Sequence, residues 1–105
     1  MMFYEMRTYT IKVGKVHEYL DHFEKVGLPI ISKYTTLVGW WYTDIGELNQ
    51  IIHIWKYDSL DQRAENRKAL YRDADWLEKF VPSAFPMLEK QESKLMYAAD
   101  FSPIK

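Results

Sequence analysis

A histidine near the middle of the chain is the residue best suited to acid–base chemistry. His53 lies in the segment from Ile51 to Tyr57, IIHIWKY, where residues two apart share one side of a strand. Its neighbours on that side are Trp55 and Tyr57. An imidazole ordinarily titrates at about pH 6.5, so His53 could act as a general base or hold a polar substrate. The alternative is a histidine that hydrogen-bonds inside a packed core and has no further role.

An arginine near the start of the chain is the second candidate for catalysis. Arg7 follows Glu5 at the strand spacing of two, and Tyr9 follows Arg7 at the same spacing. Its guanidinium could hold a carboxylate or phenolate ligand through two hydrogen bonds. Alternatively, Arg7 and Glu5 form a structural ion pair. We predict that Arg7 and His53 face one cavity from neighbouring strands.

Aromatic side chains could form the walls of a pocket for a small planar organic ligand. Trp40 and Trp41 are adjacent, so strand alternation allows only one of them to face such a pocket. The loop before the next strand has a length uncertain by one residue, which leaves open which tryptophan it is. The predicted substrate-binding residues are Tyr9, Trp41, Trp55 and Tyr57.

Neither a metal site nor a bound cofactor is expected. His17 and His22 are five residues apart, about 140° around a helix, whereas a zinc-binding pair on one helix face is four apart. The chain has no cysteine to supply thiolate ligands. The basic run from Arg63 to Arg72 is interleaved with acidic residues, which is typical of a solvated helix face.

Hydrophobic periodicity predicts the elements that position these residues. The expected strands are Phe3–Ile11, Leu37–Asp44, Ile51–Tyr57 and Glu92–Phe101. The expected helices are Lys15–Val26, continued after a bend at Gly27 and Pro29, and a second helix that begins after a Ser59 cap and resumes at Trp76.

This order indicates one α+β domain over residues 1–105, a ferredoxin-like βαββαβ fold. Right-handed crossovers place both helical layers on one face of a four-stranded antiparallel sheet in the order 4-1-3-2. We expect Tyr9, Ile51, Trp55 and Tyr57 on the other face. An apolar patch of that size is rarely left in water, which predicts a homodimer packed sheet against sheet.

Composition excludes several classes of protein. A hydrophobic content of 48% with 16% aromatic residues excludes disorder, and a net charge of −1 argues against general nucleic-acid binding. No apolar run approaches the roughly 20 residues that span a bilayer. The strand-like pattern begins at Phe3 and leaves no room for a signal peptide. We therefore expect a cytoplasmic protein with no membrane partner.

Three segments resemble the NIPSNAP family: YEMRTYTIKVGK at Tyr4–Lys15, GWWYTDIGELNQIIHIWKYDSLDQR at Gly39–Arg63, and QES at Gln91–Ser93. The resemblance implies the dimeric α/β-barrel superfamily, in which two ferredoxin-like subunits pack together. It also implies relatives that are cofactor-free oxygenases of phenolic compounds, haem-degrading enzymes, isomerases and dehalogenating enzymes. It supplies no agreed reaction or catalytic residues for the family itself.

Two functional hypotheses follow. The first is small-molecule binding or cofactor-free oxygenase-type chemistry, in a pocket between sheet and helices or inside the dimer barrel. The second is a non-catalytic dimeric module whose aromatic face serves assembly. A polar-lined cavity containing His53 and Arg7 would favour the first, and aromatic packing without a cavity would favour the second.

Overall fold

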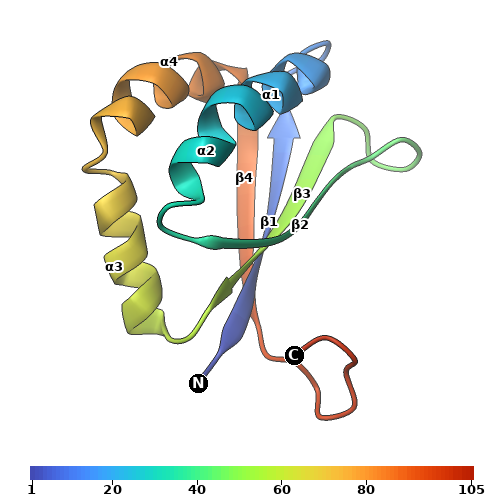
Figure 1. Ribbon diagram of the computed structural model, residues 1–105. Helices are drawn as coiled ribbons and strands as arrows, with labels where there is room; N and C mark the ends of the chain where they lie inside the picture. Colours follow the sequence, from blue (N-terminus) through green and yellow to red (C-terminus); the bar gives the residue numbers. More distant parts are fainter.

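Two strand–helix–strand crossovers build a four-stranded antiparallel sheet with helices on one face (Figure 1). The computed structural model describes all residues from 1 to 105. Its strands are β1 (Phe3–Ile11), β2 (Thr36–Tyr42), β3 (Gln50–Tyr57) and β4 (Leu88–Met96). Their order, β2-β3-β1-β4, confirms the predicted topology and the α+β, ferredoxin-like class.

The helical layers are composite. The first comprises α1 (Val16–His22), η1 (Phe23–Gly27) and α2 (Leu28–Ile31); the second comprises α3 (Leu60–Leu70), η2 (Trp76–Phe80), α4 (Val81–Ala84) and the short η3 (Phe85–Met87). No helix is long and apolar enough to cross a membrane.

Each helical layer contains one π-helical turn close to a proline. The sequence predicted a bend at Gly27 and Pro29, but the helix continues there, and the N–H of Leu28 donates to the carbonyl of Phe23 five residues earlier. The N–H of Val81 likewise donates to the carbonyl of Trp76. Each wide turn ends two residues before a proline, Pro29 or Pro82, which lacks the donor that a regular helix would need.

The Ser59 cap is confirmed at the start of α3. Its hydroxyl accepts a hydrogen bond from the backbone N–H of Gln62 at 3.0 Å, and the Gln62 side chain accepts one from the N–H of Asp58 at 2.7 Å. The first bond satisfies a donor that a helix start leaves free, and the second holds the Gln62 side chain against the residue before the cap.

One face assignment was wrong. Ile51, Trp55, Tyr57 and Tyr9 face the helices and belong to the chain's own core, with exposed fractions of 0%, 3%, 2% and 8%. The predicted alternation along the strands is correct, but the helix layer covers the opposite side from the one expected. The covered side is the more aromatic one, because a chain of this size must bury its largest apolar set to form a core.

The helix-free face has a different composition. It carries Tyr4, Met6, Ile54 and Trp41, with threonines and charged residues of both signs between them. β4 ends at Met96 rather than at the predicted residue 101. The chain after it forms a loop near the end of the sheet (Figure 1), and a groove of about 470 Å³ lies between this tail and the helix-free face.

Gly27 lies where the two helical layers meet, and we predict that Gly27→Ala destabilises the fold. A Cβ there would lie 2.7 Å from Cε1 of Phe80 and 2.9 Å from Cδ2 of Phe23. Overpacking of this kind costs about 1–3 kcal/mol, more than the ~1 kcal/mol that alanine gains in helix propensity. Urea denaturation measures the difference. Phe80→Leu, which removes the ring edge, should reduce the penalty in the double variant, and a more stable single variant would contradict the prediction.

Candidate functional site

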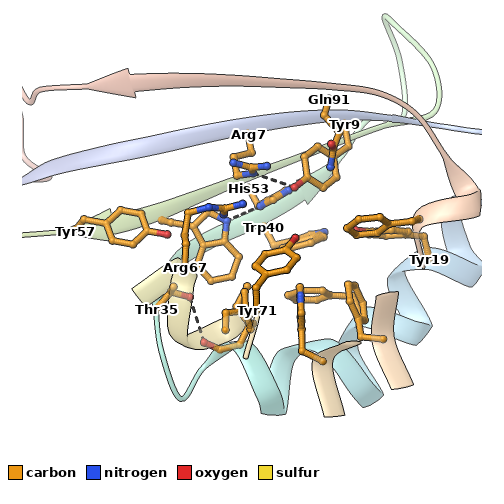
Figure 2. A pocket seen from close by; sticks show the side chains of 17 residues that line it. Arg7, Tyr9, Tyr19, Thr35, Trp40, His53, Tyr57, Arg67, Tyr71 and Gln91 are labelled. Carbon is orange, nitrogen blue, oxygen red and sulfur yellow. Dashed lines mark hydrogen bonds between the residues drawn. The ribbon is translucent and has the colours of Figure 1, made fainter. Parts of the chain in front are cut away.

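A cavity of about 140 Å³ lies between the helix-covered face of the sheet and the helices. Of the residues predicted for the site, His53, Arg7, Tyr9, Trp55 and Tyr57 all line it. Figure 2 shows Arg7, Tyr9 and His53 extending from the strands toward side chains of the helices. Arg7 and His53 therefore line one cavity, and this cavity lies between the sheet and the helices of a single chain.

Trp41 is the exception, and Trp40 takes the place predicted for it. Trp40 is paired with His53 in the register of β2 and β3, and the two rings stack with centroids 4.2 Å apart and an interplanar angle of 14°. Trp41 lies on the helix-free face and is 52% exposed. A register shift between Leu37 and Gly39 in β2 selects between the two tryptophans, and the sequence did not reveal this irregularity.

The protonation of His53 follows from its hydrogen bond. Nε1 of Trp55 lies 2.6 Å from Nδ1 of His53. An indole N–H can only donate, so Nδ1 is the acceptor and Nε2 of the neutral ring carries the proton. Burial and the positive charge of Arg7 both lower the pKa of His53, to about 3. The ring is therefore suited to donate a hydrogen bond to a ligand rather than to act as the predicted general base.

A buried carboxylate organises the charged side of the site. Glu5 is fully buried and accepts hydrogen bonds from Arg63 at 2.8 and 3.0 Å, from Arg7 at 2.9 Å and from the hydroxyl of Ser93. Burial alone would raise the pKa of Glu5, but the bonds from Arg63 and Ser93 and the charge of Arg7 lower it to about 2. The structural ion pair of Glu5 and Arg7 is thus present. Arg63 is not the simply solvated residue that its basic run suggested.

Arg7 connects this cluster to the cavity. Its Nε donates to the hydroxyl of Tyr9 at 2.9 Å, and its Nη1 donates to Glu5. Its guanidinium carbon also lies 5.4 Å from the centre of the Tyr9 ring. Two bonds therefore orient the guanidinium, and Nη2 has no hydrogen-bond partner in the protein.

The helices supply the opposite wall, which sequence reasoning did not assign to the site. Phe23 of η1 stacks on Trp40 at 4.1 Å, and Trp76 stacks on Phe80, both from η2, at 4.3 Å. Tyr19 and Tyr71 are also in the lining. Periodicity marked several of these residues as core. A π-helical turn, frequent at functional sites, shows no pattern in a single sequence.

Three buried nitrogens lack hydrogen-bond partners. They are Nε1 of Trp40, Nε2 of His53 and Nε1 of Trp76, and all three residues line the cavity. Two are indole donors. The third, Nε2 of His53, carries the ring proton because Nδ1 accepts the hydrogen bond from Trp55. Buried donors are nearly always paired, and these three unpaired ones all belong to residues of a single cavity lining.

Comparison with known proteins shows which family this chain resembles in sequence and structure. The NIPSNAP family model matches residues 4–103. Human protein NipSnap homolog 3A is 40% identical over 97 residues, which cover 91% of this chain and 39% of that protein, so the chain spans about two fifths of this relative. A crystal structure of an uncharacterized NIPSNAP domain protein from Burkholderia xenovorans is 43% identical with a TM-score of 0.91, covering 98% of this chain and 99% of that one. A NIPSNAP family protein with unknown function from Agrobacterium tumefaciens is also 43% identical, with a TM-score of 0.95 and coverage of 99% and 94%.

A more distant likeness concerns the fold alone. SnoaB, a cofactor-independent oxygenase from Streptomyces nogalater, has a TM-score of 0.65 and 13% identity, covering 97% of each chain. At this identity the likeness supports the ferredoxin-like architecture, and any chemistry must be argued from the cavity itself.

The buried neutral histidine predicts a specific pH dependence of stability. Below pH 6.5 the unfolded chain binds a proton on His53, whereas the folded chain does so only near pH 3. The free energy of unfolding should therefore fall with decreasing pH, with a slope approaching about 1.4 kcal/mol per pH unit. Below pH 4.5 the lowered pKa of Glu5 adds a second loss, which continues to about pH 2.

Urea denaturation between pH 7 and about pH 5 isolates the histidine contribution. His53→Asn keeps an acceptor for Trp55 but cannot titrate, so the difference between wild type and variant should grow as the pH rises from 5 to 7. A difference independent of pH would show that His53 has the same pKa in the folded and the unfolded chain, and would contradict the prediction.

Proposed function

We propose that this chain, which belongs to the NIPSNAP family, binds a small planar organic molecule in the cavity between sheet and helices. The observation that carries the proposal is the set of unpaired N–H donors on Trp40, His53 and Trp76. A buried donor without a partner costs about 1–3 kcal/mol, which an acceptor on a bound ligand would offset. The walls on both sides are aromatic rings, which suit a planar molecule.

The size of the cavity limits the ligand. Its volume of about 140 Å³ is close to the ~150 Å³ of an engineered protein cavity that holds benzene. A ligand with one aromatic ring and one short polar substituent matches this volume. Fused polycyclic molecules would require the helices to move.

Cofactor-free oxygenase-type chemistry is the second candidate. Such chemistry needs an electron-rich anionic substrate, and His53 is poorly suited to remove its proton. However, N–H donors directed at a phenolate or enolate oxygen stabilise the ionised form and lower the pKa of the ligand. This arrangement supports chemistry on a ligand that ionises without a protein base. The non-catalytic alternative is less well supported, because the aromatic packing leaves a cavity.

We also propose that the chain acts as a homodimer through its helix-free face. The residues that would form the contact differ from those first predicted, because Trp55 and Tyr57 belong to the core of the subunit. Instead, Trp41, Phe101 and Ile104 line the groove between the C-terminal tail and the helix-free face, here called the tail groove. They are 52%, 91% and 63% exposed. Exposed apolar patches of this kind are typical of interfaces, and one patch that meets its own copy gives two-fold symmetry.

Phenol provides a direct test of ligand binding. The chain has four tryptophans, so its ¹H–¹⁵N NMR spectrum should contain four indole N–H signals. On titration with phenol, the signals of Trp40 and Trp76 should shift because their N–H groups gain an acceptor, whereas the signal of Trp41 should not. Ile31→Phe, which fills the cavity, should abolish the shifts. Equal shifts at Trp41, or none at any tryptophan, would contradict the proposed site.

Trp41→Asp tests the homodimer. A charge in the tail groove should split the dimer while leaving the helix-covered core intact, because Trp41 makes no contribution to that core. Multi-angle light scattering at low micromolar concentration measures the mass, and far-UV circular dichroism checks the fold. Leu60→Asp, at a 55% exposed position that begins α3, is the matched control and should keep the wild-type mass. A monomeric wild type would end the proposal.

A further inference from the structure

The charged residues around the cavity indicate which kind of ligand it would bind. Two arginines, Arg7 and Arg67, are in its lining, and no aspartate or glutamate is. Glu5, just outside the lining, is the carboxylate that Arg7 and Arg63 share. The single negative charge of Glu5 is thus shared between the positive charges of Arg7 and Arg63. Arg67 forms no salt bridge and lies with its guanidinium carbon 5.8 Å from the centre of the Tyr71 ring.

The remaining polar groups of the lining cannot balance this charge. Burial raises the pKa of the Tyr19 and Tyr57 hydroxyls, so both stay neutral. The three unpaired nitrogens of Trp40, His53 and Trp76 are donors. The cavity therefore combines an excess of positive charge with an excess of hydrogen-bond donors. Water could satisfy the donors but would leave the charge without a counter-ion.

We infer that the cavity, if it binds a planar molecule as proposed above, selects a monocyclic aromatic carboxylate. A carboxylate offers about four acceptor positions on two oxygens, whereas a phenolate offers one oxygen. Unpaired N–H donors on β2, β3 and η2, together with the free Nη2 of Arg7 and the unpaired Arg67, can supply those positions. The ring of the ligand would lie among the aromatic walls supplied by Phe23 and Phe80.

Arg67 and His53 would have different functions in this site. Arg67 is half-buried on α3 and free of other ion pairs, so it would act as the counter-ion of the carboxylate. His53 is 3% exposed and held by Trp55, so its Nε2–H would donate from a fixed position. A donor that is already oriented loses little freedom when the ligand binds.

Benzoate and benzamide provide the test, because they have nearly the same shape and differ in charge. In the NMR titration of the indole signals, benzoate should bind about tenfold more tightly or better, since hydrogen bonds to a charged acceptor are about twice as strong as neutral ones. Its affinity should fall as the salt concentration rises, whereas that of benzamide should not.

Two variants locate the charge. Arg67→Gln should weaken benzoate binding about tenfold, with little effect on benzamide. Arg72→Gln is the matched control, because Arg72 is exposed beyond the end of α3 and is not in the lining. It should leave both affinities unchanged.

The outcomes separate this inference from the proposed function. Equal or weaker binding of benzoate relative to benzamide would overturn the carboxylate assignment while the cavity remained a site for planar ligands. A loss of benzoate affinity in both arginine variants would indicate a general charge effect and would also overturn the assignment. If phenol, benzamide and benzoate all left the indole signals unchanged, both proposals would fail.

Discussion

The carboxylate of Glu5 is the interaction on which the arrangement of the site depends. It lies on β1 with no exposed surface and accepts hydrogen bonds from β1 itself, from α3 and from β4. A buried charge is tolerated only when its hydrogen bonds are nearly complete, so these partners must stay in position. Arg63 thereby holds α3 against the sheet. Arg7 is held with one edge toward Tyr9 and the cavity.

Hydrogen bonds also hold the histidine in one protonation state. The indole of Trp55 donates to Nδ1 of His53 and directs the proton to Nε2, while Trp40 covers a face of the ring. Burial and the nearby guanidinium keep the imidazole neutral. The result is a fixed donor within a positive environment, which favours recognition of an electron-rich oxygen over proton abstraction.

The two π-helical turns connect helix packing to the shape of the cavity. Each precedes a proline, and together they bring Phe23, Trp76 and Phe80 to the wall opposite the sheet. Gly27 lets the two turns approach each other, because a larger residue would collide with rings from both layers. The aromatic wall therefore depends on a position with no side chain of its own.

The sequence alone determined the element order, the strand order, the helix cap at Ser59 and the alternation that groups His53 with Trp55 and Tyr57 on one strand and Arg7 with Tyr9 on another. These follow from short-range periodicity, since the side-chain period of a strand is two and crossovers are right-handed. The tertiary structure decided which face the helices cover, which tryptophan enters the cavity and how far β4 extends. Those outcomes depend on a register shift in β2 and on competition between two apolar faces for one helix layer. Only the assembled fold brought Arg63 and Ser93 to Glu5, because no local spacing relates residues more than 50 positions apart. It also brought the aromatic residues of the helices to the cavity.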